Sequence, residues 1–336
     1  MKRSTSLSLL SSFAAASVLP GHARAADLQH LRVSMAAQHA LYAPYLIPIE
    51  KGYYAQEGLV LDVTIASGGV ATPALMSNTL DISTSTPSVL SPALRGAPLK
   101  ILYTMASRSQ YQLWSADPSI KTLRDLKGKQ VGVMARGDSY EISVRLALLK
   151  AGLPLDWVNY TPLGNDAAQQ AALLSGALPA VSTTDAEAEA VRDSGGLKNG
   201  HLLYDMHKSL PMPYSGIAVT ESFLQTHRDA LHGFLRATMK GVRYMKKFKA
   251  QTIAIITKYD HNTDMHAAEF DYDSAAAVLT KDGSVSDDVL RADLEVRAAL
   301  LELPADQIPP ISKIYDYSIV RRANAELDAQ HWQPTP

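Results

Sequence analysis

Three small residues in the first quarter of the chain carry the clearest chemical signal. Ser67, Gly68 and Gly69 follow Leu59–Ile65, whose alternating residues predict a β-strand. A helix is predicted after them, with Thr72–Pro73 as its N-cap and first turn. Because glycine permits close backbone approach and helix N-termini attract anions, this segment is a candidate anion-binding loop. An ordinary strand-to-helix turn that needs a positive φ angle is the alternative.

Loops after the other predicted strands would share the same edge of a parallel sheet, where ligands bind. The candidate ligand contacts in these loops are Gln38, His39, Tyr42, Thr84, Ser85, Thr86, Arg108, Tyr111, Arg136, Asp138, Ser139, Tyr140, Thr184, Asp185 and Tyr214, beside Ser107, Gly137, Thr183 and Ser215. Arg108 and Arg136 could each offer a forked contact to an oxyanion, or lie solvated on the surface. The tyrosines could stack on a planar ligand, or pack as half-buried residues.

Patterns for catalysis or metal binding are weak in this sequence. His261, Asp264, His266 and Glu269 gather in one polar segment, but the spacing of the two histidines matches no compact zinc motif. No G-x-S-x-G, H-E-x-x-H or P-loop motif is present, and no serine has an evident base as partner. We therefore expect no catalytic residue, no metal and no cofactor.

Composition excludes several classes of protein. The chain has 336 residues, which favours two lobes or domains. Lysine and arginine number 32 against 33 aspartate and glutamate, so the basic surface of a nucleic-acid binder is not expected. The sequence has no cysteine, which excludes disulfides, thiolate nucleophiles, cysteine-ligated metals and a lipid-anchoring cysteine.

The N-terminus has the pattern of an export signal over residues 1–25. Lys2 and Arg3 precede the short apolar run Leu7–Leu19, and Ala23–Ala25 has the A-x-A cleavage pattern. A membrane anchor is the alternative, but the run is too short to span a bilayer, and Pro20 follows it at once. We expect a soluble mature protein in the bacterial periplasm that starts near residue 26.

Alternating strand and helix patterns predict βα units and mainly parallel sheets. Strands are predicted at 31–35, 59–65, 81–83, 100–104, 131–134, 178–182, 201–206 and 214–219. Helices are predicted at 45–51, 72–80, 87–94, 122–128, 140–150, 168–174, 186–192, 275–279, 288–301 and 318–327. A long amphipathic helix is predicted to start at a capping box formed by Thr226 and Asp229.

Several short phrases occur in an order that is itself informative. They are Glu50–Leu59 (EKGYYAQEGL), Ser67–Gly69, Asn78–Ile82, Arg95–Pro98, Leu123–Val133 (LRDLKGKQVGV) and Tyr214–Val219. Together they resemble the nitrate/sulfonate/taurine-type substrate-binding proteins of ABC importers, a family that includes the thiamine-pyrimidine precursor binders. The similarity covers nearly all of the mature chain.

This resemblance implies an α/β type II periplasmic-binding fold, with two lobes, a ligand cleft and two crossover hinge strands. Lobe 1 would hold residues 26–108 and, with the C-terminal helices, 215–336, while lobe 2 would hold 109–214. Such a protein delivers a small solute, of the sulfonate, nitrate, taurine or aromatic-acid class, to a permease at the inner membrane. A monomer without catalytic activity or nucleic-acid partner is implied.

One segment departs from the family pattern, and two alternative functions stay open. Residues 176–185 replace the usual Gly-x-x-Asp-Ala strand, which puts ligand contacts from that loop in doubt. The same fold occurs in enzymes of pyrimidine synthesis and of aromatic-acid decarboxylation, although the cysteine-free sequence and the export signal argue against the first. An exported sensor module is the other alternative.

Overall fold

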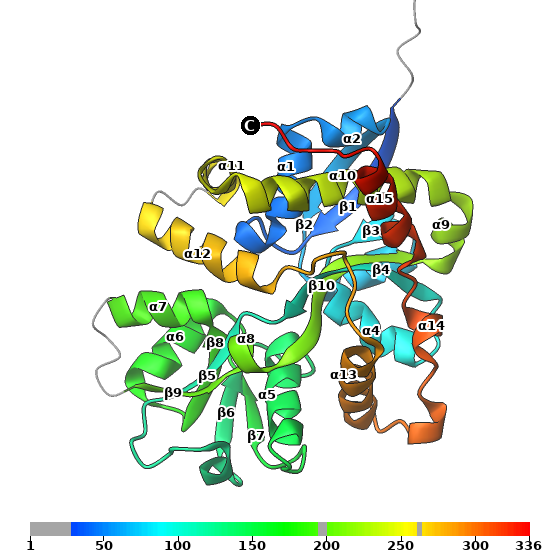
Figure 1. Cartoon of the computed structure of the whole chain (residues 1–336). Helices are drawn as coiled ribbons and strands as arrows, with labels where there is room; N and C mark the ends of the chain where they lie inside the picture. The colour runs from blue at the N-terminus through cyan, green and yellow to red at the C-terminus, as the bar shows by residue number, and fades with distance from the viewer. Residues whose placement is uncertain (1–27, 194–199, 261–263) are drawn as a thin grey trace, which may run out of the picture.

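The computed structural model describes residues 28–193, 200–260 and 264–336, which form two α/β lobes, each built on a five-stranded sheet (Figure 1). The sheet of lobe 1 has the strand order β2-β1-β3-β10-β4, and the sheet of lobe 2 has the order β7-β6-β8-β5-β9. This arrangement is the predicted two-lobed fold. The predicted signal peptide and cleavage site lie outside the described residues.

Strands from both ends of the sequence build the sheet of lobe 1. Its members are β1 (Gln29–Met35), β2 (Leu59–Ile65), β3 (Ile82–Ser83), β4 (Leu99–Arg108) and β10 (Pro211–Thr220). β1 pairs in parallel with β2 and β3, whereas β10 runs antiparallel to β3 and β4. The parallel strands therefore end at one edge of the sheet, where the chain turns into helices.

Lobe 2 repeats this plan with the middle of the chain. Its strands are β5 (Tyr111–Ser115), β6 (Gln130–Val133), β7 (Asn159–Pro162), β8 (Ala180–Thr184) and β9 (His201–Asp205). β6 pairs in parallel with β7 and β8, and β5 runs antiparallel to β8 and β9. The chain crosses between the lobes twice, from β4 into β5 and from β9 into β10, so two segments form the hinge.

Helices cover the faces of both sheets (Figure 1). The first half of the chain contributes η1 (Ala40–Tyr42), α1 (Ala43–Glu50), α2 (Tyr53–Gln56), α3 (Gly68–Met76), α4 (Thr86–Leu94), η2 (Leu123–Leu126), α5 (Ser139–Lys150), α6 (Asp166–Ser175), α7 (Asp185–Asp193) and α8 (Met206–Ser209). The C-terminal part adds α9 (Glu221–Thr226), α10 (Arg228–Lys247), α11 (Lys249–Asp260), α12 (Met265–Val278), α13 (Asp287–Leu300), η3 (Ala305–Gln307), α14 (Ile311–Ile314) and α15 (Ser318–Ala329). No helix in these ranges is long and apolar enough to cross a membrane.

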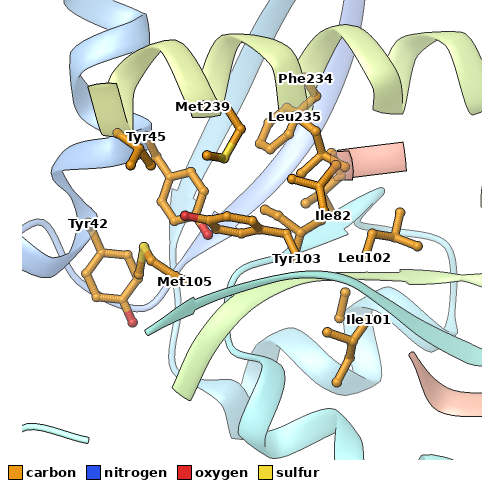
Figure 2. Close-up of a cluster of buried hydrophobic side chains, with 14 of the residues drawn as sticks. Tyr42, Tyr45, Ile82, Ile101, Leu102, Tyr103, Met105, Phe234, Leu235 and Met239 are labelled. Atoms are coloured by element: carbon orange, nitrogen blue, oxygen red, sulfur yellow. The ribbon is translucent and has the colours of Figure 1, made fainter. Parts of the chain in front are cut away.

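The core of lobe 1 lies between its sheet and α10. Figure 2 shows Phe234 and Met239 of this helix above Tyr45 and Tyr103. The rings of Tyr45 and Tyr103 meet edge to face, with centroids 6.4 Å apart, and both side chains are fully buried. Tyr45 also donates a hydrogen bond to the carbonyl of Gly216 at 2.9 Å, which ties the core to the crossover strand β10.

One C-terminal helix packs against both lobes. Val296 of α13 belongs to the buried core of lobe 2, and its neighbour Arg297 donates to the carbonyl of Pro87 in α4 of lobe 1 at 3.1 Å. We assigned residues 215–336 to lobe 1 from the sequence. The packing of α13 against the core of lobe 2 was not part of that prediction. The boundaries near 108 and 215 remain our proposed division.

Three helix starts were predicted wrongly, and the helix predicted at 275–279 is only the last part of α12, which begins at Met265. α3 begins at Gly68 because Ser67 supplies an extended N-cap residue, and Thr72 uses its hydroxyl to hydrogen-bond Ser88 of α4 at 2.9 Å instead of capping a helix. Thr226 ends α9, where its hydroxyl donates to the carbonyl of Ser222, so the predicted capping box does not form. The sequence patterns also missed β5, β7 and α11.

Candidate ligand-binding cleft

A cavity of about 560 Å³ lies between the two lobes. Its walls come from the end of β1 with η1, the turn from β2 into α3, the first turns of α4, the loop from β6 into α5, and strand β10. The lining residues are Ala36, Tyr42, Ser67, Gly68, Gly69, Ser85, Pro87, Ser88, Ser91, Met134, Ala135, Arg136, Gly137, Asp138, Ser139, Tyr214 and Ser215. Loops at the carboxyl ends of the parallel strands therefore form this site, as expected for an open α/β sheet.

The N-terminus of α3 opens directly into the cavity. The first amides of a helix have no intrahelical acceptor, and neither the amide of Gly68 nor that of Gly69 has another acceptor among the described residues. The side chain of Ser67 makes no capping hydrogen bond, so it does not cover these donors. Backbone N–H groups and the positive end of the helix dipole thus face a space where an anion could bind.

The two glycines of this turn have different roles. A Cβ atom built on Gly68 would lie 2.3 Å from the Oγ atom of Ser88, so glycine is required there for α3 to pack on α4. A Cβ atom on Gly69 would meet only the Oγ atom of Ser67, at 4.0 Å, and would project into open space. Neither glycine has a positive φ angle, so the alternative of a turn that needs this backbone conformation is wrong, and Gly68 is required by packing instead.

Hydroxyl groups of α4 continue the wall of lobe 1. Ser85 is the N-cap residue of α4, and Ser88 and Ser91 follow at three-residue spacing on the same helix face. Thr84 lies behind them, fully buried, and its carbonyl accepts hydrogen bonds from the hydroxyl of Ser215 and the amide of Gly216. This wall contains no ionisable side chain from α3 or α4.

The wall of lobe 2 is charged. Asp138 is the N-cap of α5 and accepts hydrogen bonds from the amides of Glu141 at 2.9 Å and Ala135 at 2.7 Å. Burial raises the pKa of Asp138 to about 6, and the charge of Glu141 adds to this shift although the amide hydrogen bonds oppose it. Arg136 lines the cavity and is more than half exposed. Its Nε lies 3.4 Å from the Glu141 carboxylate and its Nη1 donates to the carbonyl of Tyr160 at 3.4 Å, so the remaining N–H groups of the guanidinium are without an acceptor among the described residues.

Two tyrosines complete the lining. Tyr42 is buried in η1, and Tyr214 is half-buried on β10. The hydroxyl of Tyr111 donates to the hydroxyl of Tyr214 at 2.9 Å, so the Tyr214 proton is available for another acceptor. Burial raises the pKa of Tyr42 and of Tyr214, which keeps both hydroxyls protonated and able to donate.

Half of the predicted contacts lie outside the cavity lining. They are Gln38, His39, Thr84, Thr86, Arg108, Tyr111, Tyr140, Thr184 and Asp185. Arg108 is held elsewhere because its guanidinium donates to the carbonyls of Ala277 and Lys208. Tyr111 and Tyr140 pack on each other with ring centroids 4.1 Å apart, as the packing alternative proposed.

Two of these residues instead join the lobes or start an element. Asp185 is buried where α7 meets α12, and it accepts a hydrogen bond from the hydroxyl of Ser274 at 2.5 Å. Burial raises its pKa, although Ser274 and the nearby His207 oppose that shift. His39 caps η1 by accepting from the amide of Leu41 at 3.4 Å.

The sequence analysis missed six lining residues, which are Ala36, Pro87, Ser88, Ser91, Met134 and Ala135. Ser88 and Ser91 share a helix face with the predicted cap Ser85, and this three-residue spacing was the available signal. No group of three or more metal-binding side chains occurs in the ranges that the structure describes, which exclude His261 of the weak histidine cluster.

Solved structures with the same two-lobed architecture confirm the class of fold. The periplasmic aliphatic sulphonate-binding protein SsuA from Escherichia coli is 18% identical, with a TM-score of 0.67, over 88% of this chain and 97% of that one. The periplasmic nitrate-binding protein NrtA from Synechocystis PCC 6803 is 13% identical, with a TM-score of 0.66, over 90% of each chain. The fold is therefore that of the periplasmic binding proteins.

Sequence comparison identifies the family. Residues 39–249 match the model of the NMT1/THI5 like family, and the chain belongs to that family. The riboflavin-binding protein RibY from Chloroflexus aurantiacus is 27% identical over 208 residues, which cover 60% of this chain and 58% of RibY. The chain thus matches less than two thirds of the length of that relative.

Proposed function

We propose that this protein is an exported solute-binding protein that captures a small organic anion and delivers it to an ABC importer. The observation that carries the proposal is a cavity between two hinged lobes, whose walls offer unpaired donors from both sides. Membership of the NMT1/THI5 like family supports it, as does the fold shared with sulphonate- and nitrate-binding proteins. Closure of the lobes would exclude water and strengthen each polar contact.

The size of the cavity favours an organic solute. A space of about 560 Å³ is far larger than an inorganic anion such as nitrate needs, whereas cavities of roughly 300–1,000 Å³ hold drug-sized ligands. In our proposal the amides of Gly68 and Gly69 bind an anionic group, and Arg136 approaches it from the other lobe. Tyr42 and Tyr214 then contact the body of the ligand, which suits an aromatic acid or a sulfonate.

The cellular role follows from the same proposal. The expected signal peptide would place the protein in the periplasm, and the closed form would dock on a permease at the inner membrane. The mature protein would act as a monomer and release the solute chemically unchanged. A permease and an ATPase encoded beside this gene would favour transport over a sensor role.

A thermal-shift screen tests the proposed function. Alkanesulfonates, taurine, nitrate, aromatic carboxylates and pyrimidines are compared, since a ligand that binds only the folded state raises the melting temperature. We expect aromatic carboxylates or sulfonates to give the largest shift, and Gly69→Val to abolish it without lowering the melting temperature of the free protein. Met76→Val at the other end of α3 is the matched control because its side chain is exposed.

Two results would count against this function. If no compound class shifts the melting temperature, the proposal that the cleft binds a solute is contradicted. If mass spectrometry of the released solute shows a chemically altered compound, the protein is an enzyme and the proposal fails.

A further inference from the structure

A second, smaller cavity of about 230 Å³ adjoins the cleft, and its wall contains a buried arginine. Both cavities share Ser91, Arg136 and Gly137 as lining residues. The smaller one extends from these residues along α5 to α13, which pack side by side (Figure 1). Its remaining lining residues are Glu141, Ile142, Arg297, Leu300 and Leu301.

Arg297 is the group in this cavity whose hydrogen bonding is incomplete. Only 1% of its surface is exposed. Its Nε donates to Asp293 at 2.8 Å and its Nη1 to the carbonyl of Pro87 at 3.1 Å, while its Nη2 has no acceptor among the described residues. A guanidinium has five N–H donors, so most of the donors of this buried cation remain unused. Leaving such donors without partners is costly, and the Oδ1 atom of Asp293 is likewise buried without a donor, so the polar groups of this ion pair are not fully satisfied by each other.

The charges around the smaller cavity favour a negative acceptor. The carboxylate of Glu141 is already occupied, because it accepts from Arg145 at 2.7 Å and from the amide of Gly137 at 2.9 Å. The lining itself contains two arginines, Arg136 and Arg297, against the single carboxylate of Glu141.

Apolar side chains also line the smaller cavity. Ile142 and Leu300 lie on α5 and α13, and they would contact a hydrocarbon linker better than a polar one. We propose that the smaller cavity is a second oxyanion subsite, and that the ligand is an elongated organic diacid. One acid group binds at the N-terminus of α3, and the other reaches Arg297. This inference rests on the proposed function and specifies its substrate class.

Matched pairs of monoacids and diacids test the subsite by isothermal titration calorimetry. Hexanoate is compared with adipate, and benzoate with benzene-1,4-dicarboxylate. We expect one diacid to bind at least about tenfold more tightly than its monoacid, as a charge-assisted hydrogen bond in a buried site provides.

Two variants test whether the preference for a diacid arises in the smaller cavity. Arg297→Gln is combined with Asp293→Asn so that no buried carboxylate is left unpaired. Leu300→Trp fills the smaller cavity and leaves Arg297 in place. This variant tests the subsite if the double variant does not fold. Both should remove the preference for the diacid and leave monoacid affinity unchanged, whereas Leu149→Trp, on the exposed end of α5, should retain the preference.

The possible failures are distinguishable. Equal binding of monoacids and diacids to the wild-type protein would overturn the subsite while the solute-binding function stands, and so would a diacid preference that survives in both variants. If neither series binds and another solute does, the diacid class is wrong and the function again stands. If nothing binds, the subsite and the function fall together.

Discussion

The two walls of the cleft differ in the chemistry that they offer a ligand. The wall of lobe 1 presents backbone amides of Gly68 and Gly69 and the hydroxyls of Ser85 and Ser91, none of which changes its charge at ordinary pH. The hydroxyl of Ser88 also lines this wall, but it donates to the carbonyl of Ser85 at 2.7 Å. The wall of lobe 2 presents a network of ionised side chains around α5, with a carboxyl whose pKa lies near 6.

The two walls therefore depend on different properties of the protein. A wall of amides and hydroxyls needs only correct backbone geometry, and its affinity for an anion should not depend on pH. A wall of charged groups must hold its charges in place before the ligand arrives, because each buried charge needs a partner. Substitutions of the buried charged groups of lobe 2 should therefore affect stability and pH dependence, whereas substitutions at Gly69 should affect binding alone.

The largest expected effect is the loss of the buried ion pair behind the charged wall. Glu141 is fully buried and accepts two hydrogen bonds from Arg145, at 2.9 and 2.7 Å. Arg145→Met removes the main partner of this carboxylate and leaves it only Arg136 and the amide of Gly137. The substitution should lower the free energy of unfolding by about 3–5 kcal/mol, measured by urea denaturation.

Arg192→Met is the matched control for that prediction. Arg192 pairs with Glu189 on α7, where about half of its side chain is exposed. The same substitution should cost less than about 1 kcal/mol there. Similar losses at both positions would mean that the network around Glu141 is no more important than a surface pair.

The second effect concerns the uncharged wall. Gly69→Val should weaken binding of the best ligand by about a hundredfold or more, because the new side chain projects from the donors into the cavity. Gly68→Val should instead lower stability by about 1–3 kcal/mol, since its Cβ would collide with Ser88. Calorimetry and thermal melts of both variants separate the two outcomes, and unchanged affinity in Gly69→Val would show that the turn has only a structural role.

A smaller effect is expected at the arginine of the charged wall. Arg136→Gln removes a guanidinium that is more than half exposed, so an anionic ligand should lose about tenfold in affinity, with little change in stability. Titration calorimetry measures this loss of affinity, and Arg108→Gln is the control outside the cleft. Equal losses in the two variants would indicate long-range attraction by surface charge and no direct contact.

The smallest effect is a dependence of affinity on pH. The pKa of Asp138 is raised to about 6, so the folded protein favours the protonated carboxyl, and its contribution to stability is present at low pH and lost as the pH rises through 6. A nearby anion favours the same neutral form, so affinity for a sulfonate, which stays ionised, should increase a few-fold from pH 7.5 to pH 5.

Asp138→Asn should flatten this profile, because asparagine still caps α5 but does not titrate. Measuring the affinity of this variant across the same pH range shows whether Asp138 causes the pH dependence. A profile that keeps its slope in this variant would assign the pH dependence to another group.

The sequence predicted much of the fold, because strand and helix periods and glycine positions are local signals. It predicted β2 at its observed bounds and placed Asp138 before α5. Helix α3 was placed too late because Thr72–Pro73 has the pattern of an N-cap and first turn, whereas the N-cap residue in the structure is Ser67.

The site was predicted only in part because its walls join distant segments. Arg108 and Arg136 are equivalent as loop arginines, and only the structure shows that carbonyls of Ala277 and Lys208 hold the first. Arg297 gave no signal, because an arginine four residues after Asp293 on a helix usually forms a solvated ion pair. Its burial between two lobes depends on the packing of α13, which no local pattern reveals.

A distance measurement between the lobes tests the central claim of a hinged solute binder most directly. The chain has no cysteine, so single cysteines at exposed Met76 of lobe 1 and Leu149 of lobe 2 can carry spin labels without background. With the ligand found in the thermal-shift screen, we predict that the label-to-label distance distribution changes to a single, narrower population. An unchanged distribution at saturating ligand would contradict the account, since a solute gripped between two moving walls must alter their separation.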